Sequence, residues 1–325
     1  MTYTIVNTLD LRGAPEAVTA LEAVGRLTSL PPERAKVLPA MAAADAYLAS
    51  ASVRIDPEFL EAAPRLKVIG SPSTGTDHMD IAAIDRRGIV RFDIAREYDL
   101  INSFSATSEL AFALLLAVNR RLKPAFAAAD RGDWARERFT GFQLLGKTLG
   151  VLGLGRLGSI SARIGQGFGM RVIAHDIRDV TLPGVAMVDF ATLLERADVL
   201  TVHVHLMPAN EKIMDANALA RMKKSAILIN TSRGRIVDEA ALLAALATGT
   251  IAGAGLDVID GEWLSDEARA AHPLVAYART HDHLVISPHI GGATTESIYG
   301  ARIFMARKVA DWLSAQESAP LRASG

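Results

Sequence analysis

The stretch that decides the fold is LGVLGLGRLGSISARIGQGFGMRVIAHD, which runs from Leu149 to Asp176. An apolar strand leads into three glycines with the spacing Gly-x-Gly-x-x-Gly, at Gly153, Gly155 and Gly158. An amphipathic helix follows, and a second apolar strand then ends at Asp176. Three glycines at this spacing are a weak signal by themselves. Here the strand, the helix, the second strand and the terminal acid occur in order, which is typical of a dinucleotide-binding βαβ unit.

Each part of this unit has a physical reason if the ligand is a dinucleotide; the alternative is a glycine turn that binds nothing. The glycines allow a tight turn, a close approach to a pyrophosphate and helix–strand packing. The helix N-terminus, with Arg156 and Leu157 in its first turn, attracts phosphates. The Asp176 carboxylate would accept hydrogen bonds from the ribose hydroxyls and repel a 2′-phosphate, so we expect NAD rather than NADP. Arg178 is expected to be a solvated surface residue.

Strands and helices alternate on both sides of this unit. Six apolar strands are expected from residue 147 onward, which is the count of a complete dinucleotide-binding fold. Four are expected in the first hundred residues, near 3–7, 45–50, 66–70 and 89–93, with helices between them. One continuous helix is expected over 103–129, and a long final helix over 294–313. The fold class is therefore α/β, with parallel sheets covered by helices on both faces.

Composition narrows the class of protein. The 325 residues are too many for one small core, so two domains are expected. The formal net charge of −1 gives no reason to expect nucleic acid or a membrane surface as partner. The absence of cysteine excludes disulfides and thiolate chemistry. The longest apolar run, Leu110 to Val118, is too short to span a bilayer, and the N-terminus lacks a signal-peptide pattern. We therefore expect a cytoplasmic protein.

Three further stretches each place a polar side chain after an apolar strand. They are NTSRGRIVDE with Arg233, AGAGLDVIDGEW with Glu262, and ISPHIGGATTES with His289. Ligands of parallel sheets bind beyond the carboxyl ends of the strands, so we expect these side chains in one site. An arginine can hold a carboxylate through two N–H bonds, and a histidine beside a glutamate can transfer a proton near neutral pH. Together they could support hydride transfer between a nicotinamide and a 2-oxo acid.

Each of these residues also has an ordinary interpretation. Arg233 could cap a helix, Asp257 or Glu262 could be plain loop residues, and a single histidine is usually structural. His203 and His205 are expected to line the cofactor site, and no metal is expected because no carboxylate lies at ligand spacing from them. The histidines interpreted as structural are His78, His175, His272, His281 and His283.

The segments GKTLGVLGLGRLGS, NTSRGRIVDEAALLAAL, IAGAGLDVIDGE and SPHIGGATTES resemble, in order, the D-2-hydroxyacid dehydrogenase family over nearly the whole chain. The resemblance implies a flavodoxin-like substrate domain (1–101 plus 292–325), a Rossmann NAD-binding domain (102–291) and a homodimer. It also implies that Arg233 binds the substrate carboxylate and that Glu262 pairs with His289, the acid–base residue. The other residues that it implies in substrate or cofactor contacts are Ser73, Thr74, Gly75, Thr107, Thr231, Ser232, Asp257 and Gly292.

The sequence departs from the family pattern at several positions. Trp263 and His205 stand where proline is usual, and the segment between Glu262 and His289 carries extra residues. Ser71 replaces the phosphate-binding arginine that is typical of phosphoglycerate dehydrogenases, which disfavours a phosphorylated substrate. Glu262 stands where formate dehydrogenases have glutamine, so formate oxidation is not expected.

The sequence therefore predicts an NAD-dependent enzyme that interconverts a small D-2-hydroxy acid and its 2-oxo acid. D-3-phosphoglycerate dehydrogenase is the alternative within the same class. A nicotinamide-sensing, corepressor-like binding protein is the alternative from another class, because such relatives can retain the three polar residues.

Overall fold

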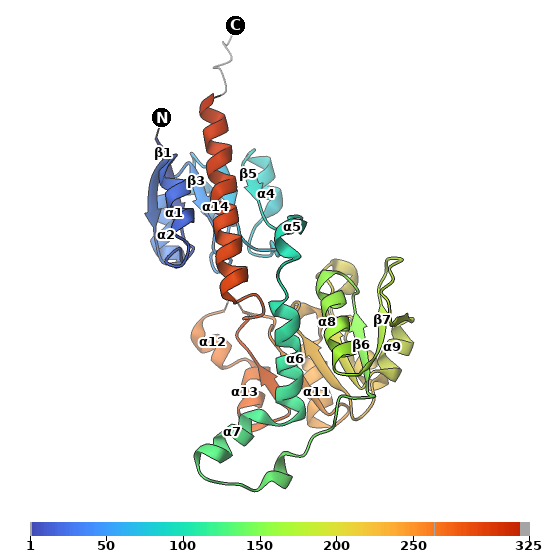
Figure 1. The fold of residues 1–325 in the computed structure, drawn as a ribbon. Coiled ribbons are helices and arrows are strands. Elements are labelled where there is room, and N and C mark those ends of the chain that lie inside the picture. The colour runs from blue at the N-terminus through green and yellow to red at the C-terminus, as the bar shows by residue number, and fades with distance from the viewer. Residues whose placement is uncertain (1, 263, 319–325) are drawn as a thin grey trace. The chain divides into compact units, whose positions relative to one another are not determined.

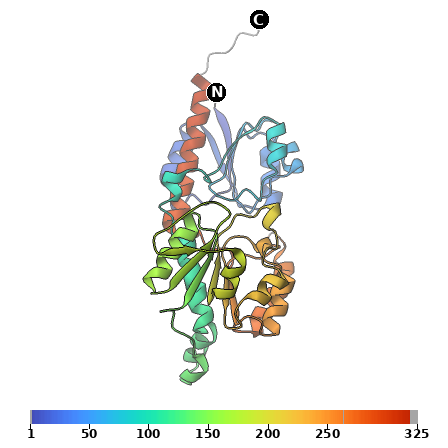
Figure 2. The ribbon, with the colours of Figure 1, turned by 90° about the vertical axis from the view of Figure 1, so that its right-hand side faces the viewer.

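The computed structural model describes residues 2–262 and 264–318, which form two compact units (Figures 1 and 2). The first unit comprises Met1–Phe104 and Ala293–Gly325, and the second comprises Ser105–Gly292. In both units a parallel sheet carries helices on its two faces, as Figures 1 and 2 show. The fold class predicted from the alternating pattern is confirmed.

The sheet of the first unit has five parallel strands in the order β2-β1-β3-β4-β5. Four of these strands were predicted, and β2 was missed because its sequence, GRLTS, has few buried positions. β2 lies at the edge of the sheet and pairs only with β1. The strands are β1 (Tyr3–Asn7), β2 (Gly25–Ser29), β3 (Ala46–Leu48), β4 (Val68–Gly70) and β5 (Val90–Phe92).

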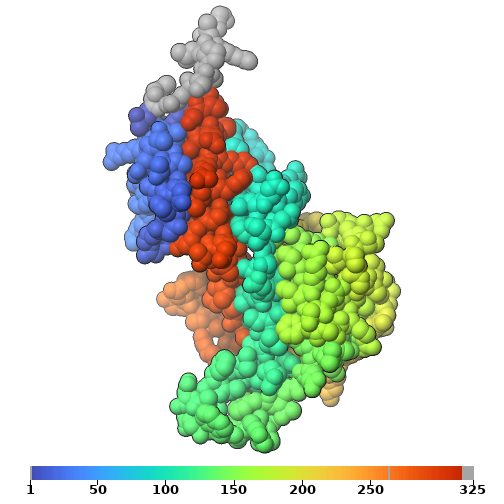
Figure 3. Space-filling view, viewed as in Figure 1, coloured from blue at the N-terminus to red at the C-terminus, as the bar shows by residue number. Residues whose placement is uncertain are grey.

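Segments from both ends of the sequence build the core of this unit. Helix α14 (Thr295–Ser318) packs on α1 (Pro15–Glu22) and on β4, and Figure 3 shows α14, in red, along the blue N-terminal segments. Met305, Val309 and Leu313 of α14 are fully buried in the same cluster as Ile5 and Leu21. The remaining helices are α2 (Arg34–Met41), α3 (Pro57–Glu61), α4 (Ile81–Arg86) and α5 (Tyr98–Ile101).

The sheet of the second unit has seven parallel strands in the order β12-β11-β10-β9-β6-β7-β8. The expectation of six strands was therefore wrong by one. The extra strand, β8, is short, largely exposed and paired only with β7, so it leaves little apolar pattern in the sequence. The strands are β6 (Thr148–Leu152), β7 (Arg171–His175), β8 (Val185–Met187), β9 (Val199–Val202), β10 (Ile227–Asn230), β11 (Gly253–Leu256) and β12 (Leu284–Ile286).

The single helix expected over 103–129 is also wrong, because two helices occupy that range. α6 (Ala106–Asn119) ends before Arg121, whose φ of 48° is left-handed, and α7 (Leu122–Asp130) then begins. Pro124 explains the break, since it lacks an N–H for the carbonyl one turn back and its ring would clash there. The apolar periodicity continues past the break and therefore does not reveal it.

By length and composition, one described segment, Tyr98–Asn119, could cross a membrane. It combines α5 with α6, and α6 packs on β10, β11 and α8 with Phe112, Leu115 and Val118 buried. A core helix passes the same composition test, so the finding is weak evidence for a membrane span. The other helices of the unit are α8 (Arg156–Gly167), α9 (Phe190–Arg196), α10 (Ala216–Arg221), α11 (Glu239–Ala247), α12 (Asp266–Ala270) and α13 (Pro273–Thr280).

Candidate active site

The glycine-rich turn between β6 and α8 has the geometry that its sequence predicts. Gly153 has φ 91°, which favours glycine, and a Cβ on Gly158 would lie 1.9 Å from the Gly153 carbonyl oxygen. The backbone N–H of Leu154 donates to Asp176 Oδ2 over 2.8 Å, which ties the end of β6 to the end of β7. The turn therefore presents its backbone and the α8 N-terminus next to the acid, as a dinucleotide cradle requires.

Two further groups at the ends of neighbouring strands fit a bound dinucleotide. Thr231 follows β10, and its Oγ1 is buried with no hydrogen-bond partner among the described residues. A buried hydroxyl without a partner is uncommon and fits a site that a ligand completes. His203 follows β9, where its Nε2 lies 2.9 Å from Thr201 Oγ1. Burial lowers the pKa of His203 to about 4, so the ring is neutral at physiological pH.

Arg178 is exposed at the surface, as expected, but it also pairs with Asp176. Its Nε and Nη2 donate to the two carboxylate oxygens of Asp176 over 3.0 and 2.9 Å, although 59% of the side chain remains exposed. These bonds and the backbone N–H of Arg178 hold the pKa of the Asp176 carboxyl at about 2. The Asp176 carboxylate, which is expected to accept hydrogen bonds from the ribose hydroxyls, is therefore already paired with a cation.

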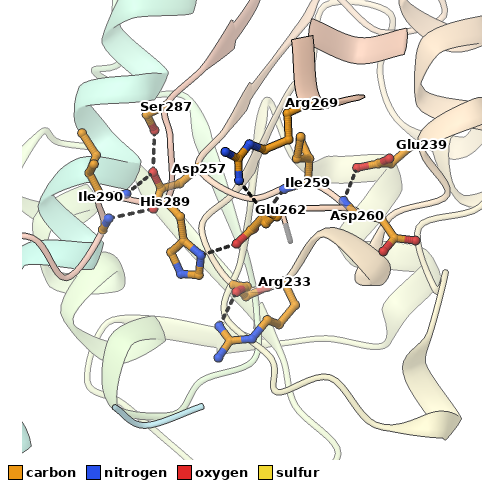
Figure 4. Close-up of polar contacts among 12 residues, drawn as sticks. Arg233, Glu239, Asp257, Ile259, Asp260, Glu262, Arg269, Ser287, His289 and Ile290 are labelled. Carbon is orange, nitrogen blue, oxygen red and sulfur yellow. Dashed lines mark hydrogen bonds and ion pairs between the residues drawn. The ribbon is translucent and has the colours of Figure 1, made fainter. Parts of the chain in front are cut away.

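Arg233 lies in a turn after β10 that packs directly against the turn after β11. The Asn230 side chain stabilises this turn, because its Nδ2 donates to the Arg233 carbonyl over 2.9 Å and its Oδ1 accepts from Ser232. A Cβ on Gly234 would lie 2.2 Å from the Ile259 carbonyl carbon, so only glycine permits the contact. This close approach brings Arg233 beside the turn that carries Glu262 (Figure 4).

Glu262 and His289 form the shortest acid–imidazole contact in the site. His289 Nδ1 lies 2.5 Å from Glu262 Oε2, and the two side chains are 44% and 20% exposed. The hydrogen bond to Glu262 raises the pKa of His289 above its ordinary value of 6.5, while burial and the nearby Arg233 charge oppose that shift. Because Nδ1 faces Glu262, Nε2 is the ring nitrogen that can meet a substrate.

Asp257 holds His289 in an unusual backbone conformation. The φ of His289 is 53°, a left-handed value that costs a non-glycine residue roughly 1–2 kcal/mol. The Asp257 carboxylate is buried and accepts from Ser287 Oγ (2.6 Å), Ile290 N (2.8 Å) and Gly291 N (2.7 Å), as Figure 4 shows in part. Its carbonyl oxygen also accepts from His289 N. These bonds fix the turn that presents His289; a nicotinamide contact of Asp257 stays a prediction.

The remaining predicted residues lie in two places. Thr107 is in the first turn of α6, beside Gly291 and so near Gly292, and the cofactor contacts of Thr107 and Gly292 stay predictions. Ser73, Thr74 and Gly75 lie in the loop after β4 of the first unit, where Ser73 Oγ donates to the Gly75 carbonyl over 2.8 Å. Their substrate contacts stay predictions.

The departures from the family pattern also have identifiable places. Ser71 is fully buried, and its Oγ lies 3.2 Å from His78 Nε2, so it cannot replace a phosphate-binding arginine. His205 is exposed, and its carbonyl accepts from Asn210. Trp263 lies outside the described residues.

Sequence reasoning did not single out Glu239, His272 and Arg269, of which Glu239 and Arg269 bond to the Glu262 turn and His272 bonds to Glu239. His272, interpreted as structural, lies 3.1 Å from Glu239, and Arg269 donates to the Glu262 carbonyl. The only available signal was the acidic residue that ends NTSRGRIVDE. Among the described residues, no cluster of three His, Cys, Asp or Glu side chains could hold a metal ion.

Two protein families match this chain. The family described as D-isomer specific 2-hydroxyacid dehydrogenase, NAD binding domain, matches residues 112–291. The family described as D-isomer specific 2-hydroxyacid dehydrogenase, catalytic domain, matches residues 6–118. The first match contains Arg233, Glu262 and His289, and the second contains the loop after β4.

Individual relatives agree with these families. A glyoxylate reductase from Thermofilum pendens is 37% identical over 82% of this chain and 78% of its own. A D-3-phosphoglycerate dehydrogenase from Mycobacterium leprae is 36% identical over 82% of this chain, which spans only 48% of that relative's length. The crystal structure of D-lactate dehydrogenase from Aquifex aeolicus, complexed with NAD and lactic acid, is 25% identical with a TM-score of 0.81, over 97% of this chain and 96% of that one.

Proposed function

The chain belongs to the D-isomer-specific 2-hydroxyacid dehydrogenases, which use NAD, and we propose that it acts on a small, non-phosphorylated substrate. The reaction interconverts a D-2-hydroxy acid and the corresponding 2-oxo acid. The observation that carries this reaction is the 2.5 Å contact between Glu262 and His289 beside the Arg233 turn.

NAD, when bound, supplies the chemistry of hydride transfer. The residues fit to hold it are those of the turn Gly153–Gly158, with Asp176, Thr231 and His203 at the ends of neighbouring strands. The neutral ring of His203 adds no positive charge there.

Arg233 and His289, the two side chains beside Glu262, have different roles toward the substrate. The planar guanidinium of Arg233 is suited to hold the substrate carboxylate and to polarise the adjacent carbonyl. His289 holds its transferable proton at Nε2, because Nδ1 is bonded to Glu262. For reduction the protonated imidazole gives this proton to the carbonyl oxygen, and for oxidation the neutral ring takes it from the hydroxyl.

The direction of the reaction fixes the sign of its pH dependence. The pKa of His289 is raised by its hydrogen bond to Glu262, so the imidazole stays protonated to a higher pH than a free histidine. Reduction needs the protonated form and should therefore be lost as pH rises through this pKa. Oxidation needs the neutral form and should rise over the same interval.

The absence of a phosphate group from the substrate is the finer part of the proposal. Ser71, buried against His78, provides no cation for a phosphate at the position where arginine is typical. Relatives named D-3-phosphoglycerate dehydrogenase are nevertheless nearly as similar as those named glyoxylate reductase, at 36% against 37% identity. Phosphoglycerate dehydrogenase activity therefore remains the second candidate.

A substrate panel separates these candidates. NADH oxidation at 340 nm would be followed with glyoxylate, hydroxypyruvate, pyruvate, branched and aromatic 2-oxo acids, and phosphohydroxypyruvate, with NADPH in parallel. We expect turnover of a non-phosphorylated compound with NADH. Preference for phosphohydroxypyruvate would favour the second candidate, and NADH binding without any turnover would indicate a nicotinamide sensor.

We also propose a homodimer in the cytoplasm. Phe126, Trp134 and Leu145, in and after α7 (green in Figure 3), are 65%, 77% and 70% exposed, which supports a partner surface there. Light scattering should give twice the chain mass, and Trp134→Ser should reduce it toward the monomer. Cell fractionation tests the location.

A further inference from the structure

A second carboxylate–imidazole pair lies behind the Glu262 turn. Glu239 is the first residue of α11, and His272 directly precedes α13. Glu239 Oε2 lies 3.1 Å from His272 Nε2, and the side chains are only 18% and 10% exposed. His272 Nδ1 is buried without a hydrogen-bond partner among the described residues. The ring therefore carries its hydrogen on Nε2 and donates it to Glu239, because a buried N–H at Nδ1 would be unsatisfied.

The other oxygen of Glu239 reaches the Glu262 turn. Oε1 accepts from the backbone N–H of Asp260 over 2.8 Å (Figure 4). Within the same turn, Ile259 N donates to Glu262 Oε1 over 3.2 Å. Glu239 thus links α11, through one carboxylate, both to the start of α13 and to the turn that ends at Glu262.

Arg269 holds the opposite end of this turn. Its Nη1 donates to the Glu262 carbonyl over 2.8 Å, and its Nη2 pairs with Asp266. Arg269 belongs to α12, in the segment that follows Glu262. This segment therefore contributes a contact to the Glu262 turn.

The charges around Glu239 make its position sensitive to loss of His272. Burial raises the pKa of Glu239, and the neighbouring Asp260 carboxylate acts in the same direction. The Asp260 N–H and His272 oppose this shift. Removing His272 would leave a buried carboxylate beside a like charge, which is unfavourable unless the turn moves.

We propose that Glu239, His272 and Arg269 are positioning residues that keep Glu262 within hydrogen-bonding distance of His289. This inference rests on the proposed function, in which His289 transfers the proton. Hydrogen bonds weaken steeply with distance and angle, so a small displacement of the turn would weaken the Glu262–His289 contact. His289 would then lose the interaction that favours its protonated form.

The test compares Glu239→Ala with Glu239→Gln and uses His289 as the reporter. Histidine NMR titration, with His289→Gln for assignment, measures the pKa of His289 without any turnover. Glu239→Ala should lower it by at least about half a unit and lower kcat of reduction about tenfold, with KM changed less than about threefold. Glu239→Gln keeps an oxygen for Asp260 N–H and should recover much of both losses.

Further variants separate positioning from general damage. His272→Gln can still donate to Glu239 and should be milder than His272→Ala. Arg269→Ala removes a partly exposed side chain, so it can carry the test if Glu239→Ala does not fold. His281→Gln and Glu195→Gln are matched controls in the same unit, where His281 contacts Tyr277 and Glu195 contacts Arg221, and they should leave the His289 pKa unchanged.

Folded Glu239→Ala and Arg269→Ala proteins with an unchanged His289 pKa and an unchanged pH profile would overturn the inference. A lower melting temperature alone would mean a merely structural role and would also overturn it. A wild-type protein without turnover would instead contradict the proposed function. The NMR titration would still decide the positioning role in that case.

Discussion

His289 and His272 each face a glutamate in the second unit, at 2.5 and 3.1 Å, in opposite surroundings. The His289 side chain is 44% exposed, lies on a left-handed backbone and has Nε2 directed away from its carboxylate. The His272 side chain is 10% exposed, and its second nitrogen is buried without a partner among the described residues. The same two functional groups can transfer a proton in one place and hold a turn in the other, and access to the second ring nitrogen makes the difference.

The largest effect is expected from removing the accessible imidazole. His289→Gln should reduce kcat/KM for the 2-oxo acid by about 10³-fold, since a positioned general acid typically contributes 10²–10⁴-fold. Binding of NADH, followed by its fluorescence, should be retained. If His272→Gln caused an equal loss, the distinction between the two pairs would be wrong.

Arg233→Ala should have the next largest effect, about 100-fold on kcat/KM, because carboxylate binding and carbonyl polarisation are lost together. Arg233→Lys should recover only part of it, since an ammonium cannot form two parallel bonds. Steady-state kinetics over a range of 2-oxo acid concentrations measures both variants. Activity of Arg233→Ala within about tenfold of wild type, or roughly 1.4 kcal/mol, would contradict this role.

Glu262→Gln should shift the pH profile. The Glu262 hydrogen bond raises the pKa of His289, so its loss should lower that pKa by about one unit. Reduction would then be lost at lower pH than in the wild type, while oxidation would become active at lower pH. An unchanged pH profile, measured for reduction and for oxidation, would mean that the 2.5 Å contact between Glu262 and His289 does not raise the pKa of His289.

Asp257→Asn tests whether the Asp257 carboxylate stabilises the left-handed backbone at His289. The amide replaces one acceptor oxygen by a donor, so at least one of the N–H bonds from Ile290 or Gly291 is lost. We expect about a tenfold loss of kcat and a destabilisation of about 1–3 kcal/mol, measured by urea unfolding. Full activity with reduced stability would contradict this prediction, because it would mean that Asp257 stabilises the fold but does not position His289 for proton transfer.

The smallest effect is expected at the pair Asp176–Arg178, in which the arginine side chain is 59% exposed and the aspartate side chain only 5%. Arg178→Ala removes the cation that neutralises Asp176, so a 2′-phosphate should be repelled more strongly. The preference for NADH over NADPH should rise by about threefold to fivefold, because the Arg178 side chain is largely exposed to solvent, which limits its interaction with Asp176 to about 1 kcal/mol. Dissociation constants of both nucleotides measure it, and a reduced preference would contradict the interpretation.

The sequence predicted the parts of this fold that local pattern determines. Buried strands such as β6 and β10 are continuous apolar runs, and the glycine spacing requires the turn that Gly153 and Gly158 make. The edge strands β2 and β8 were not predicted, because they have few buried positions and therefore little apolar pattern. The break at Arg121 lies within an uninterrupted apolar periodicity, and only Pro124 marks it.

Side-chain pairing was less predictable than the fold. Arg233, Glu262 and His289 could be nominated because each follows a parallel strand, and such strand ends meet at one edge of a sheet. Glu239 and His272 belong to two helices whose packing depends on the whole unit, so no local pattern links them. Arg178 is two residues from Asp176, but its pairing depends on a rotamer that the sequence does not specify.

The pH dependence of kcat/KM for NADH-driven reduction of the preferred 2-oxo acid tests the central claim most directly. If protonated His289 is the acid and Glu262 raises its pKa, activity is high at low pH and falls as one group loses its proton, with an apparent pKa above 6.5. An activity that does not change across this interval, or that falls at a pKa below 6.5, would contradict the account.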